Sequence, residues 1–214
     1  MITTEDQLRT LYAAPAERAL RKELDHLDVH CQRFVALSPL CVIASGGDAG
    51  RSLLDASPRG GPPGFVHVAD AQHLLLPDAG GNNRLDTLTN LLHDPRVALL
   101  FFVPGVDETL RVNGTARLRD EAAYLERFAG ERQAPKLVIE VQVREAYLHC
   151  AKALMRSRLW QAEAQVQRSV LPTLNQMIHD QIGSAAPPEA QSDMVARYAQ
   201  QIATEQGRDR LNQK

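Results

Sequence analysis

The residues of this chain best suited to chemistry lie in two short segments that combine arginine with hydroxyl, amide and glycine residues. The first is Ser57-Pro58-Arg59-Gly60, and the second is Asn83-Arg84, which follows Leu76-Pro77-Asp78 and the turn Ala79-Gly80-Gly81. An arginine guanidinium matches two phosphate oxygens, and serine or asparagine adds neutral donors. Arg84 also stands at the expected start of a helix, where free N–H groups and the helix dipole attract an anion. The combination predicts a phosphate-binding site.

The helix that carries Arg84 at its start is predicted by a periodic leucine pattern. Its apolar face is expected to comprise Leu85, Leu88, Leu91 and Leu92. Asn82 or Asn83 can cap the helix, and Asp94-Pro95 ends it because proline cannot continue a helix. Thr87 and Asn90 lie on the same segment. Their side chains either contact the phosphate or cap and solvate the helix.

Strands are expected to hold these segments in place. Short apolar or alternating runs predict strands near 40–44, 53–57, 65–69, 73–77, 97–103, 109–118 and 137–143. In Thr109–Leu118 the alternation predicts one buried and one polar face. Helices are expected at about 16–36 and 121–129, and the piece from Tyr147 to Trp160 is expected to be irregular. Many strands with few helices favour a barrel.

The C-terminal part differs in composition, being rich in glutamine, alanine and charged residues. The pattern predicts a helix over residues 161–183 with a break at Pro172, a linker over residues 184–188, and a polar helix over residues 192–207. The predicted organisation is a barrel domain over 1–160, including the N-terminal helix, and a helical extension over 161–214.

Composition excludes several classes of function. The chain has 214 residues, 44% hydrophobic and 23% charged, with a net charge of −2, which argues against bulk nucleic-acid binding. No signal peptide and no membrane-spanning apolar run is recognised, and three scattered cysteines suggest no disulfide framework, so a cytoplasmic protein is expected. His26 and His30 are expected on a solvated helix face, and no metal site is expected there. Cys150 is expected to pack in the core.

A family resemblance extends well beyond the two arginine segments. The matching pieces are Ser38-Pro39-Leu40, Asp55–Gly60, Pro63–Val66, Leu76–Asp78, Asn83–Asp86, Asp94–Val97, Glu108–Gly114 and His149–Ala153. In this order, over roughly residues 15 to 160, the chain resembles the pyridoxamine 5'-phosphate oxidase-related flavoproteins, which have an FMN-binding split β-barrel. The resemblance implies a mostly β fold with flanking helices (α+β) and a C-terminal helical extension.

The resemblance also implies flavin mononucleotide (FMN) as cofactor and a homodimer with the flavin at the subunit interface. The expected cofactor-binding residues are Ser57, Pro58, Arg59, Gly60, Leu76, Pro77, Asp78, Asn83, Arg84, Thr87, Asn90, Thr109, Arg111, Lys152, Arg156 and Trp160. Thr109 and Arg111 either contact the flavin ring or form a polar outer strand face. The trio Lys152, Arg156 and Trp160, spaced by four residues, either stacks on one helical face as a lid over the flavin or consists of a packing anchor and surface charges.

Two functions remain open at this point. The first is an oxidoreductase of the pyridoxamine 5'-phosphate oxidase-like type, exchanging hydride between FMN and an unidentified small molecule, with no catalytic side chain assigned. Pyridoxamine phosphate is not claimed as the substrate, because the C-terminal residues that would bind a pyridoxal-type phosphate in those oxidases are not recognised here, where Leu159-Trp160 leads into a different tail. The second is a non-catalytic flavin or haem protein for binding, storage or sensing, since one fold hosts many roles.

Overall fold

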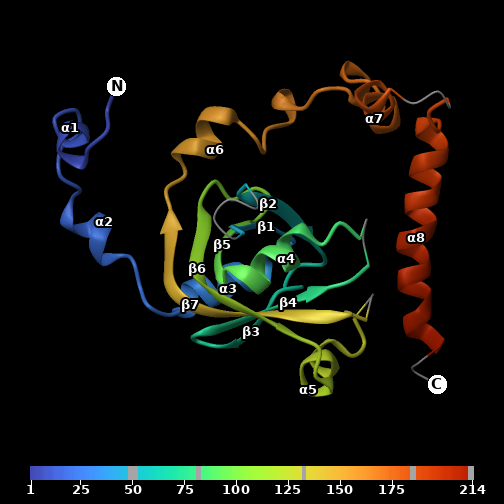
Figure 1. The fold of residues 1–214 in the computed structure, drawn as a ribbon, viewed down its shortest axis with the longest axis horizontal. Coiled ribbons are helices and arrows are strands. Elements are labelled where there is room, and N and C mark those ends of the chain that lie inside the picture. The colour runs from blue at the N-terminus through green and yellow to red at the C-terminus, as the bar shows by residue number, and fades with distance from the viewer. Residues whose placement is uncertain (48–52, 81–82, 132–133, 184–186, 212–214) are drawn as a thin grey trace.

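The computed structural model describes residues 1–47, 53–80, 83–131, 134–183 and 187–211, with side chains described as far as residue 204. Within these residues, the strands are β1 (Leu40–Ser45), β2 (Asp55–Gly60), β3 (His67–Asp70), β4 (His73–Asp78), β5 (Arg96–Phe102), β6 (Thr109–Arg119) and β7 (Leu137–His149). They form one antiparallel sheet of seven strands in the order β2-β1-β5-β6-β7-β4-β3. The sheet curls on itself (Figure 1), which confirms the predicted mostly β split barrel with flanking helices.

The barrel core follows from alternation along the central strands. Cys41 and Ile43 of β1, Phe101 of β5 and Leu110 and Val112 of β6 are all fully buried, while the residues between them are at least partly exposed. The segment predicted as an apolar strand at 97–103 therefore buries only every second side chain. One face of β1 and β5 forms the core, and the other face is apolar but only partly covered.

The helices are α1 (Glu5–Arg9), α2 (Glu17–Arg21), α3 (Val29–Leu37), α4 (Asp86–His93), α5 (Ala122–Leu125), α6 (Lys152–Ser157), α7 (Leu174–Ile182) and α8 (Gln191–Leu211). The single N-terminal helix predicted at 16–36 is wrong. Leu24 leaves the helical path and exchanges two backbone hydrogen bonds with Ala146, of 3.0 and 2.8 Å. Asp28 then starts α3 as a new helix by accepting a hydrogen bond from the Cys31 N–H group.

The region after the sheet is more regular than predicted in one place and less regular in another. The segment expected to be irregular from Tyr147 instead continues β7 to His149 and then forms α6. Over 161–183 only α7 and two short 3-10 turns are helical, and α7 begins after Pro172, where Thr173 caps it. In Figure 1, α7 and α8 lie to one side of the barrel. The division at residue 160 stays a prediction.

The three cysteines differ in burial, which makes a prediction about thiol chemistry. Burial raises the pKa of Cys31 and that of Cys41 to about 12, so both thiols stay protonated at neutral pH. Cys150 is exposed, contrary to the core position predicted from sequence, because β7 ends one residue earlier. We expect a thiol reagent such as dithionitrobenzoate to modify one cysteine per native chain quickly, and all three only after denaturation. Fast modification of two or more in the native protein would contradict this packing.

Candidate functional site

The largest gathering of the predicted site residues lies in a cleft of about 720 Å³ beside the barrel. Its walls come from β2, the end of β4, the start of α4 and the segment before β7. Nine predicted residues line it, namely Ser57, Pro58, Arg59, Gly60, Pro77, Asp78, Asn83, Arg84 and Thr87. A volume of this size suits a ligand the size of a nucleotide cofactor. Segments that are distant in sequence thus meet as the phosphate-site hypothesis requires.

The edge strand β2 positions Arg59. Because β2 pairs only with β1, Pro58 costs no hydrogen bond in the sheet interior. The Arg59 side chain is 26% exposed, and three polar groups of the described residues lie close to its guanidinium. Nε lies 3.7 Å from an Asp78 carboxylate oxygen, Nη2 donates to Thr87 Oγ1 at 3.4 Å, and Nη1 donates to the Pro58 carbonyl at 3.1 Å. The guanidinium is therefore oriented before any ligand arrives.

The hydroxyl groups in the cleft are already engaged by a carboxylate. Asp55 Oδ2 accepts hydrogen bonds from Ser57 Oγ at 2.9 Å and from Thr87 Oγ1 at 2.8 Å. A hydroxyl has one proton to donate. In this arrangement the hydroxyl protons of Ser57 and Thr87 are both donated to Asp55, which ties β2 to α4, and Thr87 also accepts from Arg59. Contact of either hydroxyl with a phosphate stays a prediction.

The start of α4 has an unusual backbone. Asn83 and Leu85 both have left-handed φ angles, of 59° and 60°, although neither is glycine. Leu85 is the N-cap residue and provides no side-chain hydrogen bond, so the first-turn N–H groups have no side-chain cap. Asn83 does not cap the helix as predicted, and Asn82 lies outside the described residues. Strained backbone at such a position is typical of ligand-binding loops.

The buried face of α4 also differs from the predicted one. Leu88 and Leu91 are buried as expected, whereas Leu85 is 54% and Leu92 73% exposed. Thr87 and Asn90 take their place on the inner face. The helix begins at Asp86, later than its leucine pattern indicated, and Arg84 stands just before it, with Nε donating to Asp86 Oδ2 at 2.8 Å. The side chain of Arg84 is 72% exposed and lies at the cleft wall.

Sequence reasoning missed Lys136, a third cation in the cleft wall. Lys136 stands just before β7, and its backbone N–H donates to the Asp78 carbonyl at 2.9 Å. No motif marked this lysine, because only the pairing of β4 with β7 brings it to the cleft. Burial raises the pKa of Asp78, and the positive charges of Arg59 and Lys136 oppose that rise. The cleft therefore combines three cations with a half-buried carboxyl group.

Four predicted residues of the barrel do not line the cleft. The Leu76 side chain belongs to the hydrophobic core. Asn90 is buried and donates to Ser45 Oγ at 3.2 Å, which holds α4 against β1. Thr109 is buried at the start of β6, and Arg111 lies over the Tyr147 ring at 5.2 Å from its centre. Their position leaves Thr109 and Arg111 with no part in the described cleft of this chain.

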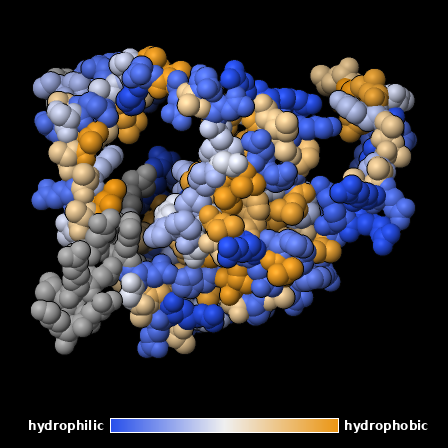
Figure 2. Space-filling model, turned by 180° about the vertical axis from the view of Figure 1, so that it is seen from behind, coloured by the Kyte–Doolittle hydropathy of each residue, from blue (hydrophilic) through white to orange (hydrophobic). Residues whose placement is uncertain are grey.

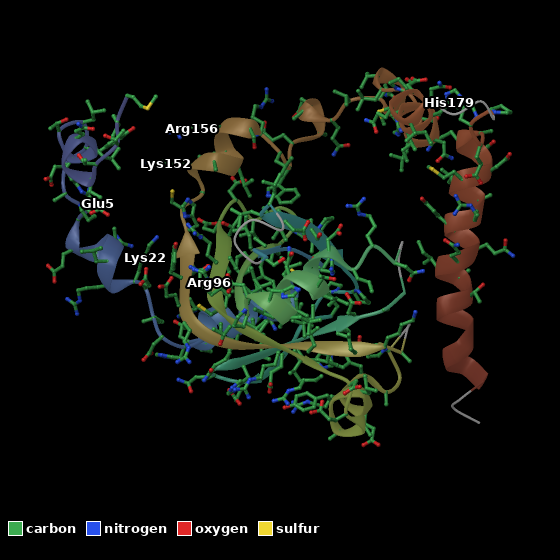
Figure 3. The ribbon with its side chains drawn as sticks, viewed as in Figure 1. Glu5, Lys22, Arg96, Lys152, Arg156 and His179 are labelled. Carbon is green, nitrogen blue, oxygen red and sulfur yellow. The ribbon has the colours of Figure 1, made fainter. Side chains whose placement is uncertain are left out.

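The predicted lid trio does not share one helical face. Arg158 adopts a left-handed conformation and ends α6, so Trp160 lies outside the helix that carries Lys152 and Arg156. Figure 3 shows these two cations on α6, and both are exposed. The Trp160 indole Nε1 donates to the Val106 carbonyl at 2.9 Å and so ties the segment after α6 to the loop before β6. The trio is not part of the cleft wall.

Two further features of the described chain bear on the sequence predictions. His26 pairs with Asp25, and no group of three or more metal-ligating side chains occurs within the described residues. In the same part of the chain, no helix has the length and apolar content that crossing a bilayer requires.

One protein-family model matches this architecture. The model of the family described as pyridoxamine 5'-phosphate oxidase matches residues 27–150, which span α3, all seven strands of the sheet and the cleft. The chain belongs to this family. The resemblance inferred from the sequence motifs is thereby confirmed, and family membership covers the cleft-forming segments as well as the barrel.

Solved structures that are similar to this chain show low sequence identity to it. HupZ from Group A Streptococcus is 14% identical, with 56% of this chain and 92% of that chain covered and a TM-score of 0.46. A putative pyridoxamine 5'-phosphate oxidase from Lactobacillus delbrueckii is 21% identical, with 59% and 98% covered and a TM-score of 0.42. An FAD binding protein from Mycobacterium smegmatis is 16% identical, with 59% and 97% covered and a TM-score of 0.41. No curated protein matched the sequence.

Proposed function

We propose that the cleft binds FMN and that the protein is an oxidoreductase that exchanges hydride between this cofactor and a small molecule. The observation that carries the proposal is that Arg59, Arg84 and Lys136 line one cleft together with the uncapped start of α4, in a member of the pyridoxamine 5'-phosphate oxidase family. Three cations and a helix N-terminus around one cleft favour an anionic ligand. FMN, when bound, supplies the hydride chemistry.

The residues of the cleft fit the phosphate of FMN. Arg59 offers a pre-oriented guanidinium, and Arg84 and Lys136 offer cationic side chains from two other walls. Free first-turn N–H groups of α4 add neutral donors in place of the engaged hydroxyls of Ser57 and Thr87. The protein's own contribution in this proposal is to bind and orient the cofactor, since the cleft wall supplies no histidine or cysteine within the described residues.

That composition of the wall favours a second candidate function, a flavin protein that binds the cofactor without turnover. The described wall has few side chains that could act as a general acid or base at neutral pH. Asp78 is the one carboxyl group in that wall with a raised pKa. Storage or sensing needs only the binding groups. The two candidates share the same site and differ in whether bound flavin reacts with a substrate.

A phosphate-dependent titration tests the proposal. Flavin fluorescence is followed as protein is added to FMN and, in parallel, to riboflavin, which lacks the phosphate. We expect FMN to bind and riboflavin to bind far more weakly, and Arg84→Ala to weaken FMN binding alone. No binding of FMN would overturn the assignment and shift the search to haem, followed by its absorption spectrum. Reduction of the FMN complex and reoxidation by air or candidate small molecules then separates an oxidoreductase from a binder.

We also propose that the protein is a homodimer that uses the outer face of β1 and β5. Val42 pairs with Leu100 and Leu40 with Phe102 across these strands, and all four side chains are apolar and partly exposed on that face. Figure 2 shows that apolar side chains gather on the face of the molecule opposite to that in Figure 1. A monomer rarely leaves such a sheet face uncovered. Family resemblance favours a second copy as its partner.

The dimer proposal predicts that Leu100→Arg yields a monomer. An arginine at this register would place a charge in the centre of the proposed contact, where it is costly to bury without a partner. Size-exclusion chromatography with light scattering measures the mass directly. Val166→Arg, at a side chain that is 71% exposed in the C-terminal extension, is the matched control and should leave the mass unchanged. A wild-type monomer that still binds FMN would contradict the dimer while leaving the cofactor site intact.

A further inference from the structure

Asp78 is an unexpected residue in a cleft built for an anion. It is the last residue of β4, its side chain is 16% exposed, and it lines the cleft beside the cations. Its contact with Arg59 Nε, at 3.7 Å, is a long ion pair. Within the described part of the chain, no donor hydrogen-bonds its carboxylate. A half-buried carboxylate with so little direct stabilisation depends on the nearby positive charges.

The charged groups around Asp78 come from every wall of the cleft. Arg59 reaches it from β2, and Lys136 lies in the segment that leads into β7. Arg84 and Asp86 stand at the start of α4, paired with each other through a 2.8 Å hydrogen bond. Asp55 accepts the hydrogen bonds of the Ser57 and Thr87 hydroxyl groups and adds a further negative charge. Among the described residues, Arg59 and Lys136 are the cations that favour the ionised form of Asp78. A phosphate bound in the cleft would require the same two cations.

We propose that Asp78 takes up one proton when a phosphomonoester binds in this cleft, so that the carboxyl group sets the charge that the cleft accepts. The inference rests on the proposed function, since it concerns the phosphate of the same ligand. The proton comes from solvent and forms an O–H bond on the Asp78 carboxyl group, with no redox change. A phosphate dianion engages Arg59 and Lys136 and brings two negative charges close to Asp78. Both effects disfavour the ionised carboxylate.

The pH dependence of binding follows from this linkage. The pKa of Asp78 is already raised in the free protein by burial, and the bound dianion raises it further. Binding therefore takes up a proton at pH values between the two pKa values. The contribution of Asp78 to affinity is greatest below its pKa in the free state and falls as pH rises through its pKa in the bound state, by at most about tenfold per pH unit for one proton. A flavin without phosphate should show no such dependence.

Isothermal titration calorimetry with FMN tests the proposal directly. Titrations at several pH values from 5 to 8, each in two buffers of different ionisation enthalpy, give the number of protons exchanged per FMN bound at each pH. We expect wild-type protein to take up more protons than Asp78→Asn does, with the difference approaching one proton at its maximum. Asp78→Asn should also bind FMN about tenfold more tightly near pH 8, because no carboxylate then competes with the phosphate for Arg59. Comparing the two proteins cancels any protons exchanged by the FMN phosphate itself, whose second pKa is about 6.

Asp94→Asn is the matched control, because the Asp94 side chain is about as exposed as that of Asp78, at 17%, and is paired with Arg96, but it does not line the cleft. This variant should keep the proton uptake of the wild type. Loss of uptake in Asp94→Asn, or equal uptake in wild type and Asp78→Asn, would overturn the assignment to Asp78 while FMN binding itself stands. Failure of wild-type protein to bind FMN would overturn the proposed function and this inference with it. Carboxyl ¹³C resonances of the wild-type protein give a readout that needs no variant, since FMN should move the titration of Asp78 to higher pH.

Discussion

Gly114→Ala is expected to destabilise the protein by about 3 kcal/mol or more, the largest effect of any single methyl group that the fold suggests. Gly114 lies in β6 beside a bulge, where Asn113 pairs with Glu145 and Gly114 with Val143. A Cβ atom at Gly114 would lie 2.1 Å from the Gln142 backbone oxygen. Because the neighbour is backbone of the longest strand pair, it cannot move aside without breaking the β6–β7 ladder.

Urea denaturation followed by far-ultraviolet circular dichroism measures this change as a fall in the free energy of unfolding. Gly60→Ala is the matched control for the loss of a strand glycine. At Gly60 the added Cβ would approach nothing closer than 3.5 Å, so the substitution should be neutral or stabilise by up to about 1 kcal/mol through the unfolded state. Equal stability of Gly114→Ala and wild type would show that the close approach of β6 and β7 is wrong.

Arg59→Ala is expected to weaken FMN binding by about 10- to 100-fold, while leaving riboflavin binding unchanged. The guanidinium is the cation in the cleft with the most fixed geometry, and a charge-assisted hydrogen bond contributes about 1.5–3 kcal/mol. Arg59→Lys keeps the charge and loses the fork, so it should recover part of the affinity. Flavin fluorescence titrations at constant ionic strength give the dissociation constants for both ligands.

Arg96→Ala is the control for the loss of one positive charge. Arg96 is 84% exposed at the start of β5, is paired with Asp94, and does not line the cleft. Its removal should change FMN affinity little, because exposed charges at a distance are screened by salt. The proposal for Arg59 would fail if riboflavin and FMN lost affinity equally, since that result would indicate damage to the cleft as a whole. It would also fail if FMN bound Arg59→Ala as tightly as wild type.

Local sequence was sufficient to predict the family, the class of fold and the two arginine segments of the cleft. The signals used were short-range: apolar residues in alternation, proline or glycine at the ends of elements, and Asp94-Pro95 at the end of a helix. Each strand that they predicted is present within a few residues. The motifs around Arg59 and Arg84 are also local signals, because their residue types and spacing alone predicted an anion site. Local signals failed where a distant segment competes, as at Leu24, whose backbone pairs with Ala146 instead of continuing a helix.

Only the tertiary structure decided which residues share the cleft. Pairing of β4 with β7 brings Lys136 to Asp78, and packing of α4 beside β2 places Thr87 next to Asp55 and turns Asn90 inward. The sequence by itself therefore determined the kinds of side chain available for an anion and the strands that carry them. The charge balance of the site was decided by contacts between residues far apart in the chain, because electrostatic interactions depend on distance in space and on burial.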